Sequence, residues 1–255
     1  MLRKKGSVIM NKVALVTGGS RGIGKATVIE YAKHGYDVVV NYVNDELAAN
    51  FLKEEVEREY KVKALTIKCD VSNEQDVKNM INEVISTFGK IDVLVNNAGI
   101  ALDTVFEDKT KENFMKILEV NLVGTFLVSK EVGKYMLNAK SGSIINISST
   151  NGIDTFYPES LDYDASKAGV ISLTKNLALV YHPYVRVNTV APGWVMTDMN
   201  KELSSSFIKT EEEKILLKRF ADPIEIAKVI YFLGTDDASY VNGSVIRVDG
   251  GVSNV

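Results

Sequence analysis

Tyr163 and Lys167 lie four residues apart in the run Tyr-Asp-Ala-Ser-Lys, and side chains of these types could perform acid–base chemistry. Residues at positions i and i+4 of a helix share a face, so a phenol and an ammonium group would project side by side. A free tyrosine has a pKa near ~10 and is a poor base at neutral pH, but a neighbouring positive charge lowers that pKa. The pair is therefore a candidate general acid/base for an alcohol or a carbonyl group. The alternative is an ordinary exposed helix face, where this spacing is common.

A glycine-rich turn near the start of the chain predicts a nucleotide site. The apolar run Val13–Thr17 is typical of a buried parallel strand, and it leads directly into the turn Gly18–Gly24, after which apolar residues recur at helical spacing. The N-terminus of the helix would offer free N–H groups and a positive dipole end to a pyrophosphate. Gly18 and Gly22 would permit positive φ or close backbone approach, and Gly24 would permit close packing of helix on strand. A glycine-rich turn without a ligand is the alternative.

Positioning these groups requires a sheet, and the rest of the chain predicts one. Short apolar runs alternate with helical segments, which indicates a single α/β domain with a Rossmann-type doubly wound parallel sheet of about seven strands and helices on both faces. The expected strands are Val13–Thr17, Asp37–Tyr42, Lys63–Lys68, Val93–Val95, Ser143–Ile147, Val185–Val190 and Val245–Val248. The expected helices are Ile23–His34, Glu46–Glu59, Glu74–Phe88, Lys111–Leu137, Leu161–Tyr181, Ser205–Leu217 and Ile224–Leu233. Ligands of such sheets bind at the carboxyl ends of the strands, where each motif falls.

Composition excludes several classes of function. The net charge of −3 gives no case for binding to nucleic acid or to a membrane surface, and no apolar run approaches a membrane span. The single cysteine, Cys69, is typical of a reducing compartment, so we expect a cytoplasmic protein. With only two histidines, we expect no metal site. Residues 1–10 are interpreted as a mobile leader and residues 11–255 as the folded domain.

The motifs together resemble those of a classical short-chain dehydrogenase/reductase. The resemblance covers nearly the whole chain from about Asn11, and within the family it is most similar to the bacterial 3-oxoacyl-[acyl-carrier-protein] reductases. The segments that carry it, in the order of the family, are Thr17–Gly24, Asn96–Gly99, Asn121, Ser148-Ser149, Tyr163–Lys167 and Pro192-Gly193.

The resemblance implies a catalytic role for four side chains. Tyr163 would donate a proton to the substrate carbonyl, and Lys167 would lower the pKa of that tyrosine and bind the nicotinamide ribose. Ser149 would stabilise the developing oxyanion, although Ser148 is its neighbour and rival. Asn121 would expose a backbone carbonyl that holds a water linking Lys167 to solvent; the alternative is a polar residue that merely kinks a helix.

The cofactor implied by the resemblance is NADP, with NAD as the alternative. No carboxylate stands at Asn41, where an acidic residue would bind the ribose of NAD, and Arg21 lies where a 2′-phosphate would bind. Asp45 is close in sequence and weakens this preference. The expected cofactor-binding residues are Gly18, Ser20, Arg21, Gly22, Ile23, Gly24, Asn41, Tyr42, Asp70, Val71, Asn97, Ala98, Gly99, Tyr163, Lys167, Pro192, Gly193, Val195 and Thr197.

The substrate region departs from the family pattern. Residues 198–218 form a polar stretch that we expect to be a substrate loop or lid, with a solvated surface helix as the alternative. One extra residue separates Ser149 from Tyr163, and the segment 153–158 between them is unusually aromatic. Reductases of acyl-carrier substrates usually present basic residues beside the site; Lys140 matches one such position, whereas Tyr184 occupies the other.

Three functions therefore remain open. The first is reduction of a 3-oxoacyl thioester, with an acyl-carrier protein as a candidate partner. The second is the same chemistry on a sugar, polyol or small ketone, and the third is a non-catalytic NADP sensor. The resemblance also implies a homotetramer, with the helices 111–137 and 161–181 at one interface and the C-terminal strand at another.

Overall fold

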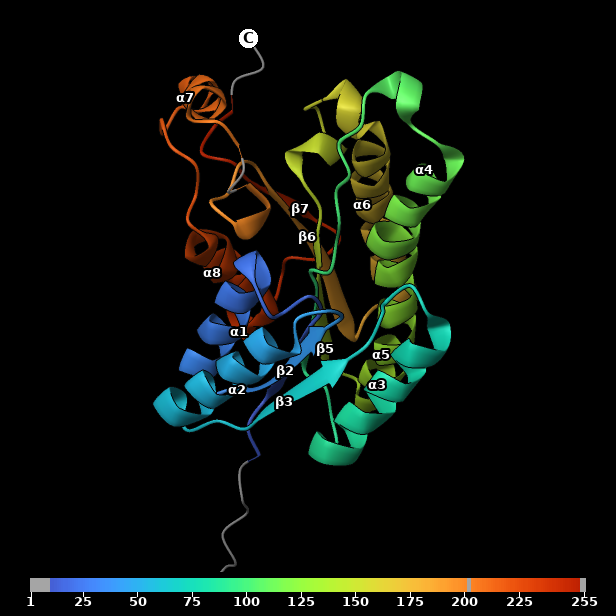
Figure 1. The fold of residues 1–255 in the computed structure, drawn as a ribbon. Coiled ribbons are helices and arrows are strands. Elements are labelled where there is room, and N and C mark those ends of the chain that lie inside the picture. The colour runs from blue at the N-terminus through green and yellow to red at the C-terminus, as the bar shows by residue number, and fades with distance from the viewer. Residues whose placement is uncertain (1–9, 201–202, 253–255) are drawn as a thin grey trace, which may run out of the picture.

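The computed structural model of the protein describes residues 10–200 and 203–252, and its centre is a seven-stranded, all-parallel sheet. The strand order is β3-β2-β1-β4-β5-β6-β7, which confirms the predicted doubly wound architecture (Figure 1). The strands in the middle of the sheet are buried on both faces, as continuous apolar runs require. The strands are β1 (Val13–Val16), β2 (Asp37–Tyr42), β3 (Ala64–Lys68), β4 (Val93–Asn96), β5 (Gly142–Ile147), β6 (Val185–Pro192) and β7 (Val245–Val248).

Helices cover both faces of the sheet. In Figure 1, α1, α2 and α8 lie on one side, and α3, α5 and α6 lie on the other. Each face of the sheet has its own apolar core. One core includes Val28 and Ile230, and the other includes Val77 and Leu177. The helices are α1 (Gly22–Lys33), α2 (Glu46–Tyr60), α3 (Glu74–Phe88), α4 (Lys111–Leu118), α5 (Gly124–Ala139), α6 (Leu161–Tyr181), α7 (Ser205–Lys214) and α8 (Pro223–Gly234).

Short helical turns connect these elements at the carboxyl edge of the sheet and elsewhere. They are η1 (Phe106–Asp108), the π-helical η2 (Glu119–Val123), η3 (Thr150–Gly152), η4 (Pro158–Ser160), η5 (Asp198–Asn200) and η6 (Asp236–Ala238). The turns η3 and η4 join β5 to α6, so the aromatic segment 153–158 lies directly before the helix that carries Tyr163.

Two expected helices differ from those in the structure. The single helix predicted over Lys111–Leu137 is divided into α4 and α5 by the π-turn η2, where one extra residue per turn lets the buried Asn121 face the site. The helix predicted over Ser205–Leu217 ends at Lys214. Beyond it, Ile215 adopts an extended conformation and is buried, and the next two residues donate backbone hydrogen bonds to the chain near Gly250.

Parts of the predicted leader and lid fall outside the described residues. Of the leader predicted over residues 1–10, only Met10 is described, and residues 201–202 of the predicted lid are not. Among the described residues, no helix combines the length and the apolar character needed to cross a membrane.

Candidate active site

The predicted site residues meet where the direction of strand order reverses, between β1 and β4. In open parallel sheets this reversal opens a crevice outside the carboxyl ends of the strands, and ligands bind there. The glycine turn follows β1, the Asn-Ala-Gly segment follows β4, Ser149 follows β5, and Pro192 ends β6. Topology thus brings four sequence-distant motifs to one edge of the sheet.

The glycine turn has the backbone that a bound dinucleotide needs. Gly18 and Gly22 have φ values of +59° and +54°, a region that residues with a Cβ rarely adopt. A Cβ on Gly24 would lie 2.2 Å from the backbone oxygen of Gly18, so only glycine lets α1 begin this close to the turn. Ser20 and Ile23 are half-buried in the same turn, beside the N-terminus of α1. These features fit a pyrophosphate at the helix N-terminus.

Asn97 fastens the segment after β4 to the glycine turn. Its Nδ2 donates to the backbone oxygens of Thr17 and Gly18, both at 3.0 Å. The hydroxyl of Thr17 in turn accepts hydrogen bonds from the backbone N–H groups of Asn97 and Ala98. Thr17 was not among the predicted site residues, and its strand-end position before the glycines is the signal that could have identified it.

The side chain of Asn41 holds the glycine turn in place by hydrogen bonds. It is 1% exposed, its Oδ1 accepts from the N–H of Gly18 at 3.1 Å, and its Nδ2 donates to the backbone oxygen of Cys69 at 2.9 Å. Both ends of the side-chain amide are thus bonded to the protein. A direct contact with the cofactor stays a prediction for the backbone of Asn41 and not for its side chain. Arg21, in contrast, is exposed at the start of α1.

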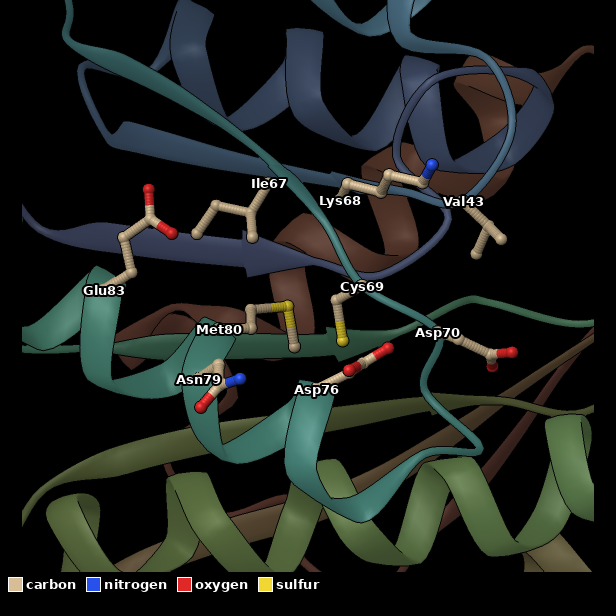
Figure 2. A pocket seen from close by; sticks show the side chains of 9 residues that line it. All are labelled: Val43, Ile67, Lys68, Cys69, Asp70, Asp76, Asn79, Met80 and Glu83. Carbon is tan, nitrogen blue, oxygen red and sulfur yellow. The ribbon is translucent and has the colours of Figure 1, made fainter.

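The end of β3 borders a small cavity of about 260 Å³, seen in Figure 2. Asp70 lines it, and its Oδ1 accepts from the backbone N–H and the hydroxyl of Ser72, which shapes the turn after β3. The next residue, Val71, is buried beneath Gly124. In Figure 2 the sulfur of Cys69 lies near Asp76. Burial raises the pKa of this thiol to about 12, so it stays protonated and unreactive.

The segment after β6 comes back over the glycine turn. A Cβ on Gly22 would lie 3.4 Å from Cγ2 of Thr197, which puts these two predicted cofactor residues side by side. Gly193 follows Pro192 and packs on Asp249, where a Cβ would approach the Asp249 Cβ to 2.8 Å. Val195 is 4% exposed and belongs to the core beneath the segment.

Tyr163 and Lys167 project from α6 as their spacing predicts. Lys167 Nζ lies 5.4 Å from the centre of the Tyr163 ring and donates to the backbone oxygen of Ile147 at 2.9 Å. Burial lowers the pKa of Lys167 to about 8. Burial also raises the pKa of Tyr163 to about 12, although the Ser149 hydroxyl acts to lower it. We expected the neighbouring lysine to lower this pKa, but in the structure desolvation of the phenol dominates and the pKa is raised, so the phenol holds its proton at neutral pH.

The two serines after β5 have different surroundings. Ser148 is buried, and its Oγ donates to the backbone oxygen of Lys167 at 2.8 Å, which anchors α6 to the sheet. Ser149 lines the large cavity together with Tyr163, and its Oγ donates to Oδ1 of Asn151 at 3.2 Å. The second serine is therefore the one whose hydroxyl can reach a substrate.

Asn121 forms a hydrogen-bonded bridge to α6, the helix that carries Tyr163 and Lys167. Its Oδ1 accepts from the N–H of Ile100 at 2.8 Å, and its Nδ2 donates to the backbone oxygen of Ile100 and to Oγ of Ser166. The backbone oxygen of Asn121 accepts from the hydroxyl of Thr125 at 2.8 Å. The π-turn therefore joins the segment after β4 to α6, one residue before Lys167.

A large cavity of about 840 Å³ opens beside Ser149 and Tyr163. Its walls come from the segments after β4 and β5, from the segment after β6 and from α7, so part of the predicted 198–218 lid lines it. Trp194 and Phe207 pack edge to face in one wall, with ring centres 5.6 Å apart. A cavity of this size and composition is typical of sites for small molecules.

Several polar contacts in these walls were not predicted. Asp164 accepts from Nδ2 of Asn151 at 2.7 Å and so positions the partner of Ser149. The buried carboxylate of Glu211 accepts from the phenol of Tyr157 at 2.9 Å. The aromatic character of segment 153–158 was a sequence signal for the contact between Tyr157 and Glu211. No sequence signal indicated the contact between Asn151 and Asp164.

The two positions at which basic residues were expected to contact an acyl-carrier protein lie far from the cavity of the same chain. Lys140 is the C-cap of α5 and Tyr184 precedes β6, so both lie at the amino edge of the sheet. Lys140 Nζ lies 5.6 Å from the centre of the Tyr184 ring. Within one chain, this pair is at the edge opposite to Ser149.

Comparison with known proteins identifies the family of the chain. The family described as enoyl-(acyl carrier protein) reductase matches residues 18–253. The 3-oxoacyl-[acyl-carrier-protein] reductase FabG of Staphylococcus epidermidis is 41% identical over 244 residues, which cover 95% of this chain and 99% of that protein. A short-chain type dehydrogenase/reductase from Mycobacterium marinum superposes with a TM-score of 0.91 at 33% identity, covering 97% of each chain.

A further solved structure widens the range of similar proteins. The acetoin dehydrogenase YohF of Salmonella typhimurium has a TM-score of 0.86 at 34% identity, covering 95% of this chain and 96% of its own. In sequence and fold, the likeness to these proteins thus covers almost the entire chain. The protein belongs to the short-chain dehydrogenase/reductase family, oxidoreductases that use NAD(P) to interconvert CH–OH and C=O groups.

Proposed function

We propose that this protein is an NADP-dependent reductase of 3-oxoacyl thioesters. The observation that carries the proposal is the meeting of Ser149 and Tyr163 on the wall of an 840 Å³ cavity, in a chain 41% identical to a 3-oxoacyl-[acyl-carrier-protein] reductase. By that likeness, an acyl-carrier protein is a candidate carrier of the substrate.

Tyr163 acts as the general acid. NADPH, when bound, supplies the hydride. With a pKa raised to about 12 by burial, the phenol holds its proton at neutral pH and can pass it to the carbonyl oxygen as negative charge develops there. Ser149 donates its hydroxyl hydrogen to the same oxygen and stabilises the charge. Lys167, as an ammonium group near the ring, favours the phenolate left after proton transfer.

The cofactor is held by the glycine turn and the strand ends. Gly18, Gly22 and Gly24 leave room for the pyrophosphate at the start of α1. Arg21, exposed beside this turn, would bind the 2′-phosphate of NADP through its planar guanidinium group. Asp45, the carboxylate that weakened this preference, is engaged as the N-cap of α2, where it accepts from the N–H of Ala48 at 2.9 Å.

The assembly proposed for the protein is a homotetramer. Apolar side chains that a monomer leaves exposed support it, among them Leu179 and Val180 on α6, which are 72% and 64% exposed, and Phe126 on α5. These helices correspond to the interface implied by the resemblance. The range 198–218 is proposed as the lid over the substrate.

The test is to follow oxidation of NADPH and of NADH in the presence of acetoacetyl-CoA. The proposal expects turnover with acetoacetyl-CoA and a clear preference for NADPH. Turnover of small ketones such as 2,3-butanedione, with silence on acetoacetyl-CoA and on acyl-carrier thioesters, would contradict it.

A second candidate function is reduction of a small polar ketone. It is favoured by the place of Lys140, at the edge of the sheet opposite to the cavity, and by the likeness to an acetoin dehydrogenase. The butanedione arm of the same experiment decides between the two. A non-catalytic NADP sensor would bind NADPH and reduce neither compound.

A further inference from the structure

The carboxylate of Asp164, the residue after Tyr163, accepts hydrogen bonds on both of its oxygens. Oδ1 accepts from Nδ2 of Asn151 at 2.7 Å and from the hydroxyl of Ser160 at 3.1 Å. Oδ2 accepts from the backbone N–H of Tyr157 at 3.3 Å. All three donors belong to the segment that joins β5 to α6 and lines the large cavity. Asp164 therefore fastens this wall of the cavity to the first turn of the helix that carries Tyr163.

The contact with Asp164 decides which end of the Asn151 amide faces Ser149. The two ends of an amide group have nearly the same shape, but one donates and the other accepts hydrogen bonds. An ionised carboxylate only accepts, so the NH₂ group of Asn151 turns to Asp164 and Oδ1 turns to Ser149. Oδ1 then accepts the hydroxyl hydrogen of Ser149, with 3.2 Å between the two oxygens. The carboxylate thus fixes the partner of a hydroxyl that lines the cavity.

Asn151 holds the Ser149 oxygen by a second contact. Its backbone N–H donates to Oγ of Ser149 at 3.2 Å, while the hydrogen of that hydroxyl is directed to the side chain of Asn151. A side chain that acts on a substrate has to be held within about 0.5 Å of its productive place by contacts of this kind. The two hydrogen bonds therefore keep the Ser149 hydroxyl in one place on the cavity wall before a substrate binds.

A substrate has to take over the hydroxyl hydrogen of Ser149 from Asn151. The existing contact is 3.2 Å long and joins two neutral groups. A hydrogen bond to an oxygen that gains negative charge is shorter and about twice as strong. The exchange is therefore nearly neutral with the ketone and becomes favourable as charge develops on its oxygen. An interaction that is stronger in the transition state than in the ground state increases kcat.

We propose that Asp164 is a positioning residue, which acts through the side-chain amide of Asn151 to hold the Ser149 hydroxyl where it stabilises the developing oxyanion. This inference rests on the proposed function and deepens it. Asp164 also acts directly on the reacting phenol, since its charge raises the pKa of Tyr163. That second effect does not pass through Ser149, so variants of Ser149 separate the two.

The test is a pair of double-mutant cycles on kcat, measured with NADPH and acetoacetyl-CoA or, if the thioester is not reduced, with 2,3-butanedione. Asp164→Ala and Asn151→Ala are each made in wild type and in Ser149→Ala. In wild type, each should lower kcat about tenfold, less than the roughly 10²–10³ expected for loss of an oxyanion donor itself. In Ser149→Ala, neither should lower kcat by more than about twofold further, because the positioned hydroxyl is absent. KM for NADPH should stay within about twofold in all variants.

Equal losses of kcat in wild type and in Ser149→Ala would overturn the inference. A general loosening of the wall, or the effect of charge on Tyr163, would act in both backgrounds and give that result. An unchanged kcat in Asp164→Ala and Asn151→Ala would overturn the inference as well. If Asp164→Ala does not fold, Asp164→Asn takes its place. It keeps the shape of the side chain but leaves one acceptor oxygen for three donors, so its loss of kcat should also depend on Ser149.

Asp103→Asn is the matched control for the effect of charge. Asp103 is a carboxylate of the cavity wall, and it also raises the pKa of Tyr163. Removing its charge should change kcat by the same factor in wild type and in Ser149→Ala. A dependence on Ser149 as large as that of Asp164 would mean that any change of charge near Tyr163 has this effect, and it would overturn the inference.

Failure of the proposed function gives a different result. If wild type reduces 2,3-butanedione but not acetoacetyl-CoA, the thioester proposal fails, and the cycles with butanedione still decide the positioning role. If it reduces neither, crystal structures of wild type, Asp164→Ala and Asp103→Asn decide that role. Several conformers of Ser149 in Asp164→Ala, with a single one in the other two proteins, would sustain the inference. The same single conformer in all three proteins would overturn it.

Discussion

Lys167 Nζ lies 5.4 Å from the centre of the Tyr163 ring, and it donates to the backbone oxygen of Ile147 at 2.9 Å. One turn of α6 thus places an ammonium group beneath a phenol, while β5 supplies the carbonyl that orients it. Lys167 is only 4% exposed, so keeping it charged costs stability. A buried ammonium group that lowers stability indicates that Lys167 is present for a function and not for the stability of the fold.

Replacing Lys167 by Met should therefore stabilise the protein at neutral pH while abolishing activity. The pKa of Lys167 is about 8 in the folded protein, whereas its ordinary value is 10.5. Between these two pH values the lysine is protonated in the unfolded chain and neutral in the folded protein. The destabilisation is present in full below about pH 8 and disappears as the pH rises toward ~10.5. We expect the free energy of unfolding to increase by about 1–3 kcal/mol at pH 7.

Urea denaturation at pH 7 and at pH 10 measures this effect. Lys175→Met, at an exposed position of the same helix, is the matched control and should leave the free energy of unfolding nearly unchanged. If Lys167→Met is less stable than wild type at pH 7, or if its gain in the free energy of unfolding persists at pH 10, the buried ammonium group does not destabilise the protein.

Asn121→Ala should destabilise the site region and lower activity together. The substitution removes three hydrogen bonds of the buried Asn121 side chain and leaves the partly buried N–H and C=O groups of Ile100 without this partner. Each unsatisfied buried group costs roughly 1–3 kcal/mol, so we expect a loss of about 3 kcal/mol in the free energy of unfolding. Asn176→Ala, an exposed asparagine of α6, is the control and should cost far less. Equal losses in the two variants would refute the bridging role.

Arg21→Ala should change the cofactor preference. A charge-assisted hydrogen bond to a phosphate contributes about 1.5–3 kcal/mol, so KM for NADPH should increase about tenfold or more while KM for NADH stays nearly constant. Lys25→Ala removes a charge one turn further along α1 and should affect both cofactors little. Steady-state kinetics with each cofactor measures this, and a parallel change in both KM values would mean that Arg21 does not contact the 2′-phosphate.

Lys109 and Asp162 should be strongly coupled. Their side chains are 4% and 0% exposed and meet at 2.8 Å, one residue before Tyr163. Removing one partner leaves a buried charge unpaired and should cost about 3–5 kcal/mol. The double variant Lys109→Met/Asp162→Asn should therefore lose much less than the two single losses added together.

A double-mutant cycle on the free energy of unfolding tests this coupling. The exposed pair Lys12–Asp236, at 3.3 Å, provides a reference cycle in which little coupling is expected, because solvent screens both charges. Additive losses in the Lys109–Asp162 cycle would mean that the buried pair contributes no more than a surface contact.

The regular elements of the fold could be predicted from the sequence because their patterns are local. The helices α3 and α6 and the strands β2 and β7 have the predicted bounds, since apolar periodicity and strong end signals determine them. The π-turn at Asn121 could not be predicted. It depends on where Ile100 and Ser166 offer partners, and those residues are distant in sequence.

The sequence predicted which candidate site residues lie close together, but it did not predict their pKa values. The motifs placed Ser149, Tyr163 and Lys167 together, whereas the pKa of Tyr163 depends on burial by surrounding elements that no motif encodes. The contact of Glu211 with Tyr157 is of the same kind, since 54 positions separate the two residues. Asn41 likewise required the structure, because only the fold shows that its side chain faces inward.

The proposed mechanism depends on proton donation by Tyr163, and Tyr163→Phe removes the donating hydroxyl. Its rate of NADPH oxidation with acetoacetyl-CoA, or with the best ketone substrate, should be compared with that of wild type, alongside NADPH affinity from fluorescence titration. We expect a loss of roughly 10²–10⁴ in kcat, as for removal of a general acid, with NADPH affinity nearly unchanged. A variant that binds NADPH and turns over as fast as wild type would contradict it.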